Sequence, residues 1–208
     1  MNFLRMKEPG NTLTHFIPFL AGIVGLFFLI GSAPSPSKMI TSAIFGVSVI
    51  LLYGASSLYH WIRTTPEKTL LLRKIDHIAI FFLIAGTYTP VSYFGLEGTW
   101  KWSILILVWS IVALGTFLKI FFMQMPRWIS TLLYLGLGWV AIIPFAEFLR
   151  LLPMGAITLM IAGGIAYTIG GVIYGTKRFR YFHETFHCFV ALGTLLHFFM
   201  IYFFILPI

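Results

Sequence analysis

Seven long apolar segments are the feature that most constrains the fold of this 208-residue chain. Each has close to the roughly 20 residues that a membrane-spanning helix needs, and each ends at charged or Pro/Gly-rich positions. Only 10% of the residues are charged, whereas a soluble domain carries about 25%. We therefore predict an all-α membrane protein, a single seven-transmembrane helix bundle over residues 1–208, with helices at about 13–31, 39–62, 75–94, 102–122, 128–146, 154–175 and 183–206.

The distribution of Lys and Arg predicts the orientation of this bundle. Of the 14 such residues, three (Lys38, Lys101 and Arg150) fall at one end if the helices alternate in direction. The others fall at the opposite end: Arg5, Lys7, Arg63, Lys68, Arg73, Lys74, Lys119, Arg127, Lys177, Arg178 and Arg180. The positive-inside rule then predicts a cytoplasmic N-terminus and a C-terminus outside. The net charge of +8 is explained by this topology and by attraction to anionic lipid, so we expect no nucleic-acid partner.

Four ionisable side chains are predicted to meet at the cytoplasmic boundary, and such groups in spanning helices mark functional sites. His60 lies at the end of the second helix, Asp76 at the start of the third, and His183 and His187 at the start of the seventh. His183 and His187 share one helix face because they are four residues apart. Together with His60 they supply three nitrogen ligands, which leaves the fourth position of a tetrahedral Zn²⁺ for water.

The same geometry suggests roles for two further groups. Asp76 is predicted to hold the water or take its proton, and Ser56, one turn before His60, to hydrogen-bond that water. A two-cysteine metal site is excluded because Cys188 is the only cysteine. The competing interpretation is that these histidines cap helix ends or bind loop carbonyls.

The segment HETFH, residues 183–187, also fits the zinc-protease pattern H-E-x-x-H. A protease of that type needs a third ligand further on, but position 193 is Gly and no Asp or Glu follows Glu184. We therefore interpret the segment as H-x-x-x-H and expect Glu184 to pair with Arg180 or Lys177 at the start of the helix.

The remaining polar groups receive weaker expectations. His197 lies ten residues after His187, about 15 Å deeper, and is predicted to be a packed or hydrogen-bonded core histidine. His77 is predicted to be a boundary residue that snorkels to the membrane surface. Glu8, Asn11 and His15 either support the metal ligands or form the start of the first helix, and both interpretations stay open.

Three motifs in order make the chain resemble the progestin and adipoQ receptor (PAQR) family, and within it the bacterial hemolysin III branch. The first is E-x-x-N-x-x-T-H, present as EPGNTLTH with Glu8, Asn11, Thr14 and His15. The second is S-x-x-x-H, present as SSLYH, followed by the Asp that opens the third helix. The third is the H-x-x-x-H that opens the seventh helix.

This resemblance implies a multi-pass protein of the bacterial cell (inner or plasma) membrane with zinc bound by His60, His183 and His187. The motifs are also similar to those of the alkaline ceramidases, which implies hydrolysis of a lipid amide or ester with Asp76 as general base and Ser56 as orienting group. Membrane lipid is then the expected partner, with its acyl chain in a cavity between helices. Two alternatives remain: a membrane-perturbing, pore-forming protein, and a sensor of membrane state with structural zinc. The sequence indicates no particular soluble protein partner.

Overall fold

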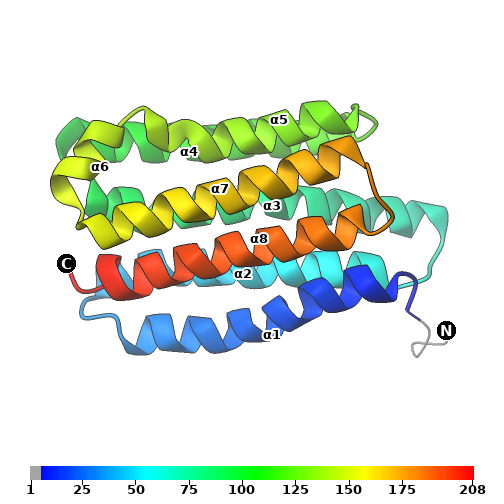
Figure 1. Cartoon of the computed structure of the whole chain (residues 1–208), viewed down its shortest axis with the longest axis horizontal. Helices are drawn as coiled ribbons and strands as arrows, with labels where there is room; N and C mark the ends of the chain where they lie inside the picture. Colours follow the sequence, from blue (N-terminus) through cyan, green and yellow to red (C-terminus); the bar gives the residue numbers. More distant parts are fainter. Residues whose placement is uncertain (1–5) are drawn as a thin grey trace.

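The computed structural model describes residues 6–208 as a bundle of helices, without a β-strand in that range. The long helices run side by side, and α1 begins at one end of the bundle while the last helical turn lies at the other (Figure 1). In chain order the elements are α1 (Pro9–Gly31), α2 (Pro36–Trp61), α3 (Pro66–Gly95), α4 (Gly98–Phe121), α5 (Arg127–Gly138), the 3₁₀-helix η1 (Trp139–Ile142), α6 (Phe145–Leu151), α7 (Met154–Thr176), α8 (Phe182–Met200) and the π-helix η2 (Ile201–Ile205).

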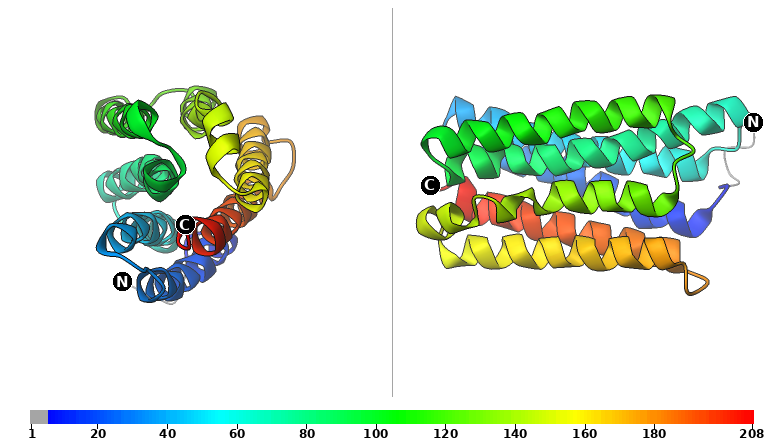
Figure 2. Two further views of the ribbon diagram at one scale, coloured as in Figure 1. Left: turned by 90° about the vertical axis from the view of Figure 1, so that its left-hand side faces the viewer. Right: turned by 90° about the horizontal axis from the view of Figure 1, so that it is seen from above.

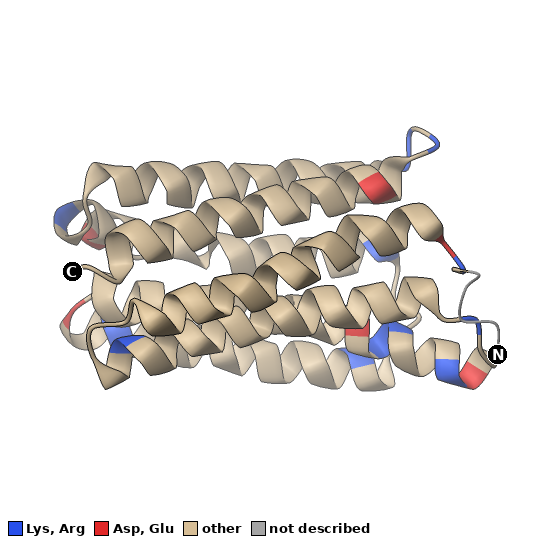
Figure 3. Cartoon of the chain, turned by 90° about the horizontal axis from the view of Figure 1, so that it is seen from below, with Lys and Arg blue, Asp and Glu red and all other residues tan. Residues whose placement is uncertain are grey.

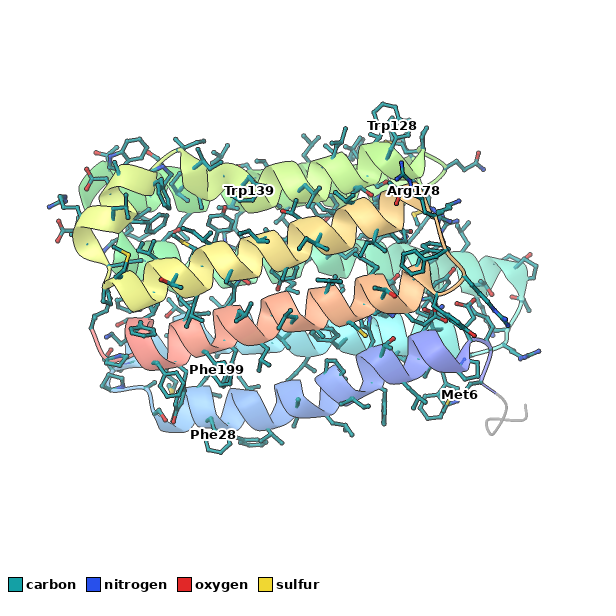
Figure 4. All side chains as sticks on the ribbon, in the orientation of Figure 1. Met6, Phe28, Trp128, Trp139, Arg178 and Phe199 are labelled. Carbon is teal, nitrogen blue, oxygen red and sulfur yellow. The ribbon has the colours of Figure 1, made fainter. Side chains whose placement is uncertain are left out.

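Six helices are long and apolar enough to cross a membrane, and the bent pair Arg127–Ile142 and Phe145–Leu151 makes a seventh if it counts as one span. The predicted all-helical membrane protein is confirmed at this level. Apolar side chains such as Phe28 and Trp128 point away from the bundle (Figure 4), as expected for surfaces in contact with lipid. Charged residues gather toward the two ends (Figure 3).

The predicted start of the third helix is wrong by more than two turns. The helix begins at Pro66 rather than near 75, with the Thr65 side chain accepting a hydrogen bond from the Lys68 amide. Charged residues mark where an apolar segment ends, but Glu, Lys and Arg are also good helix formers, so α3 continues beyond the apolar stretch. The helix also continues through Pro90 to Gly95.

The predicted continuous helix over 128–146 is broken in the structure. Regular α-helix stops at Gly138, the chain tightens into η1, and α6 departs with a bend of 50°. Pro144 precedes α6 and has no N–H to donate, which prevents the helical ladder from continuing. Tyr88 of α3 braces this break: its hydroxyl donates to the Gly138 carbonyl at 2.7 Å and accepts from the Ala141 amide at 2.7 Å.

The helices pack as a closed ring around the bundle axis. Around the ring the neighbours are α1, α2, α3, α4, α5, α7 and α8, and α8 closes it against α1 (Figure 2, left). The site end is defined here as the end where α1, α3, α5 and α8 begin and α2, α4 and α7 finish. The Lys and Arg residues that were predicted to share one end of the bundle belong to the site end. Arg5, which was predicted with them, lies outside the described residues.

Candidate metal centre

Three histidines from two helices form a cluster at the site end. His60 lies in the last turn of α2, and His183 and His187 lie one turn apart at the start of α8. One ring nitrogen from each lies within 4.8 Å of the other two. His60 and His187 are each 1% exposed, whereas His183 is half-buried. The structure thus brings together all three residues of the predicted ligand set.

Glu8 fixes His60 from the segment before α1. Backbone hydrogen bonds from the Lys7 and Glu8 amides to the carbonyls of Trp61 and His60, both 3.0 Å, hold this segment against the end of α2. Glu8 Oε2 then lies 2.7 Å from His60 Nδ1. A carboxylate only accepts, so Nδ1 carries the proton and Nε2 is left with its lone pair. Nε2 has no hydrogen-bond partner among the described residues, although it is buried.

The environment of Glu8 keeps it a carboxylate. Partial burial raises its pKa, but hydrogen bonds from Asn11 and His60 and the charge of Lys7 outweigh burial, so the pKa lies below 4.5. Asn11 Nδ2 donates to Glu8 Oε2 at 2.9 Å. Lys7 Nζ lies 3.7 Å from the other carboxylate oxygen. The negative charge beside the cluster is therefore present at neutral pH.

Thr14 fixes His187 in the same manner. Its hydroxyl lies 2.9 Å from His187 Nδ1 and 2.9 Å from the Gly10 carbonyl. The single hydroxyl proton goes to that carbonyl, which can only accept, so Nδ1–H of His187 is the donor to Thr14. His187 Nε2 is consequently free to coordinate. Two residues of the first motif therefore contact the cluster: Glu8 bonds His60, and Thr14 bonds His187. The Glu8 side chain does not cap α1.

The donor set fits a zinc ion. Nitrogens bound to one tetrahedral zinc lie roughly 3.3 Å apart, given bond lengths of about 2.0–2.1 Å, so small ring rotations from the observed separation within 4.8 Å suffice. Two of the imidazoles have the tautomer that exposes Nε2, and one of these atoms is buried without a partner. Neutral imidazoles held by carboxylate or hydroxyl partners are the usual arrangement of metal-binding histidines.

Asp76 and Ser56 lie beside the cluster. The Ser56 hydroxyl and the Asp76 carboxylate are hydrogen-bonded, which links α2 to α3. Ser56 is 1% exposed, whereas Asp76 retains some accessible surface because it lines the cavity that the three histidines also line. The Asp76 carboxylate and the three histidines therefore line the same cavity.

The fourth histidine of this region, His15, packs against the cluster without joining it. Its ring stacks on that of His187 with centroids 3.6 Å apart and meets the ring of Tyr53 edge-on at 4.9 Å. Both of its nitrogens are buried, and neither has a hydrogen-bond partner among the described residues. Its ring therefore limits the orientations that the His187 ring can adopt.

Two expectations for neighbouring polar groups are wrong, and one is confirmed. His77 does not extend to the membrane surface; it lines the cavity with Nδ1 3.1 Å from the Tyr134 hydroxyl. Glu184 forms no ion pair with Lys177 or Arg180 in the described chain, because it packs beside Gly10 at the start of α1. His197 is a hydrogen-bonded core histidine as predicted, with Nε2 3.2 Å from the Met160 carbonyl.

A cavity of about 750 Å³ extends from the cluster into the bundle. Along α3 its lining runs from Arg73 to Tyr88, which at 1.5 Å per residue is about 22 Å. Beyond Asp76 and His77 the lining side chains are mostly apolar or aromatic, among them Ile80, Leu83 and Ile84. The cavity is thus a long apolar chamber with its polar and metal-binding groups at one end. The family resemblance implies a cavity between helices, but the sequence alone does not indicate which residues line it, because that depends on how the helices pack.

The whole bundle, rather than one motif, is similar to known proteins. A family model described as haemolysin-III related matches residues 3–198. Over 205 residues the chain is 38% identical to a protein named Hemolysin-3 homolog from Bacillus subtilis (strain 168), which covers 97% of this chain and 96% of that protein. Over 204 residues it is 34% identical to Hemolysin-3 of Bacillus cereus, with coverages of 97% and 93%.

Proposed function

Because this chain belongs to the haemolysin-III-related family, we propose that it is a zinc-dependent hydrolase of lipid amide or ester bonds. The observation that carries the proposal is the position of the three-histidine cluster and Asp76 at the polar end of a long apolar cavity. Metal ligands, a carboxylate and space for an acyl chain are the parts that such a reaction requires.

His60, His183 and His187 would hold the zinc ion, with Glu8 and Thr14 fixing two of the rings. Zinc bound there supplies Lewis acidity, which polarises a substrate carbonyl and makes water a stronger nucleophile at neutral pH. The surrounding residues exclude bulk solvent from the cluster, which strengthens the electrostatic interactions within it.

Asp76 would be the general base. Its carboxylate accepts a proton from water as the water oxygen adds to the carbonyl carbon, and Ser56 keeps the carboxylate in position by hydrogen bonding. The same proton then passes from Asp76 to the departing nitrogen or oxygen as the C–N or C–O bond breaks. The products are a fatty acid and an amine or alcohol.

The cavity would hold the acyl chain of the substrate. Its length along α3, about 22 Å, exceeds the roughly 15 Å of hydrocarbon in one leaflet, so a complete acyl chain fits within it. Ile80, Leu83 and Ile84 supply an apolar wall next to Asp76. Membrane lipid is therefore the proposed substrate class.

The site end would face the cytoplasm and the protein would reside in the bacterial plasma membrane. Support comes from the excess of Lys and Arg at this end, which the positive-inside rule places in the cytoplasm. With an odd number of spans the C-terminus lies outside. The reaction centre would then act on the inner leaflet.

A membrane-perturbing activity is the second candidate, because one relative carries the name Hemolysin-3. A water-filled pore needs polar groups along its whole length. The ionisable lining residues gather instead at one end, apart from His197, and the remaining wall is mostly apolar with a few hydroxyl groups such as those of Thr87 and Thr168. The hydrolase therefore accounts for more of the structure than the pore does.

The test measures zinc and turnover on the same purified samples. We expect about one zinc per chain in the wild type, and loss of most of it in His60→Ala and His187→Ala. His197→Gln is the matched control, since His197 lies on α8 outside the cluster and should leave the zinc in place. Asp76→Asn should retain zinc and lose about 10²–10⁴-fold in hydrolysis of short-chain ceramides and acyl esters.

Different results separate the candidates. Wild-type protein without zinc would contradict both the metal site and the hydrolase. Zinc in the wild type with no turnover, together with unfolding of His187→Ala, would favour the structural-zinc sensor. Solute leakage from vesicles that persists in Asp76→Asn would favour the membrane-perturbing protein.

A further inference from the structure

Two arginines begin the cavity-facing stripes of α3 and α5. On α3 the lining residues follow Arg73 at helical spacing as Asp76, His77 and Ile80. On α5 they follow Arg127 as Thr131, Tyr134 and Leu135. Both arginines therefore lie at the site end, on the helix faces that line the cavity. The histidine cluster lines the same cavity.

Neither guanidinium forms an ion pair with a carboxylate in the part of the chain that the structure describes. The Arg127 guanidinium carbon lies 5.0 Å from the Tyr174 ring centroid, and its Nη1 is buried without a hydrogen-bond partner. No ion pair or hydrogen bond is formed by Arg73 among residues 6–208. Both side chains are only partly exposed.

The acidic groups that line the cavity are already engaged. Glu8 binds His60 and Asn11, and Asp76 binds Ser56. Asp76 attracts Arg73 electrostatically, but neither guanidinium that lines the cavity forms an ion pair with a carboxylate among residues 6–208. Unpaired charges in a membrane protein are costly, and they mark the place where a ligand of opposite charge binds.

We propose that Arg73 and Arg127 bind the phosphate group of a phospholipid whose acyl carbonyl lies at the histidine cluster. Planar guanidinium forks suit phosphate oxygens, which accept two parallel N–H bonds. Arg73 precedes Asp76 by one helical turn, about 4.5 Å along the axis, and phosphate and ester carbonyl in a phospholipid are separated by only a few bonds. This inference rests on the proposed hydrolase and makes its substrate an anionic phospholipid rather than a neutral lipid.

A general attraction of positive charge to anionic lipid headgroups explains the positions of Arg73 and Arg127 less well. Arg178, in the loop after α7, is exposed at the same end (Figure 4) and is free to serve that purpose. Arg73 and Arg127 instead line the cavity. A lipid is favoured over free inorganic phosphate because the cavity beyond the arginines is apolar, as an acyl chain requires.

The experiment measures binding of an ether-linked phosphatidic acid with short alkyl chains. This probe has the phosphate group but no acyl ester or amide bond for the proposed hydrolase to cleave. Zinc-loaded protein in nanodiscs is titrated with this probe, with the matched dialkylglycerol that lacks phosphate, and with inorganic phosphate. Wild type should bind the phosphatidic acid about tenfold or more tightly than the dialkylglycerol, and Arg127→Gln and Arg73→Gln should each lose most of this preference. Arg178→Gln removes a charge from the same end and should keep it.

The outcomes are decisive in either direction. Arg127→Lys retains the positive charge but lacks the paired N–H donors of the guanidinium, so its preference for phosphatidic acid over dialkylglycerol should be intermediate. This variant also controls for the case in which Arg127→Gln fails to fold. Equal binding of the two lipids by wild type, an equal loss in Arg178→Gln, or inorganic phosphate that binds as tightly as the lipid would each overturn the proposal. Ceramide hydrolysis without any phosphate preference would overturn it while leaving the hydrolase intact. Arginine-dependent lipid binding without turnover would overturn the hydrolase and leave the phosphate site.

Discussion

At the residue scale, Glu8 and Thr14 determine which nitrogen each of two ligand imidazoles presents to a metal. Glu8 accepts from Nδ1–H of His60, and Thr14 accepts from Nδ1–H of His187. Both rings therefore have a fixed tautomer and a fixed orientation before an ion arrives. A partner of this kind also increases the basicity of the ligand, so it contributes to affinity although it never touches the metal.

We predict that Glu8→Ala and Thr14→Val each weaken zinc binding by about 10–100-fold, because the ring loses its orienting partner. The affinity is measured by competition with a zinc chelator of known strength. Glu67→Ala and Thr185→Val are the matched controls, because Glu67 is exposed, Thr185 is half-buried and bonds the Tyr181 carbonyl, and neither residue belongs to the cluster. Unchanged affinity in both test variants would show that the histidines are oriented without these contacts.

The three histidines could be predicted from the sequence, whereas for Glu8 the sequence leaves two roles open and for Thr14 it assigns none. Spacing of four residues places His183 and His187 on one face, and alternation of helices places His60 at the same boundary. Glu8 reaches His60 only because backbone hydrogen bonds hold the segment before α1 against the end of α2. No local pattern encodes that contact. In the sequence Arg73 and Arg127 indicate only topology, because nothing in the sequence shows that they line the cavity.

At the element scale, the break between α5 and α6 is stabilised from outside the broken span. Gly138 and Ala141 have backbone groups that leave the α-helical pattern, and the Tyr88 hydroxyl bonds both. Free backbone groups at membrane depth are tolerated only where the protein supplies partners. Apolar composition indicated a helix here, but composition does not report where the backbone changes course; Pro144 was the available signal.

We predict that Tyr88→Phe lowers the free energy of unfolding by about 1–3 kcal/mol, because the carbonyl of Gly138 and the amide of Ala141 lose their partner. Denaturation in mixed micelles measures the change. Tyr93→Phe is the control, since Tyr93 lies on the same helix and its hydroxyl bonds no described residue. Equal stability of Tyr88→Phe and the wild type would mean that water or lipid replaces the hydroxyl.

At the scale of the whole molecule, composition and charge predict most of the architecture. Long apolar segments imply spanning helices, and the ring of neighbours in the structure follows mainly from short connections between them. The cavity does not follow in this way. It forms because α3, α5, α7 and α8 surround a space that their side chains leave unfilled.

The proposed orientation can be tested with single cysteines in a Cys188→Ser background, since Cys188 is exposed. Lys68→Cys lies at the site end and Thr99→Cys at the other, and both positions are exposed. An impermeant thiol reagent should label Thr99→Cys on spheroplasts with intact inner membranes and Lys68→Cys only after lysis. The reverse pattern would place the site end outside. The Cys188→Ser variant without an added cysteine measures the background labelling.

The starts of the first and the last long helices meet at the histidine cluster, and this has a consequence for biogenesis. Glu8 and Thr14 leave the ribosome with the first helix, whereas His183 and His187 arrive with the last. A nascent or truncated chain that stops before α8 holds only His60 of the ligand set and has no chelating pair. Metal binding by all three histidines would then require a chain that has been synthesised through the start of α8.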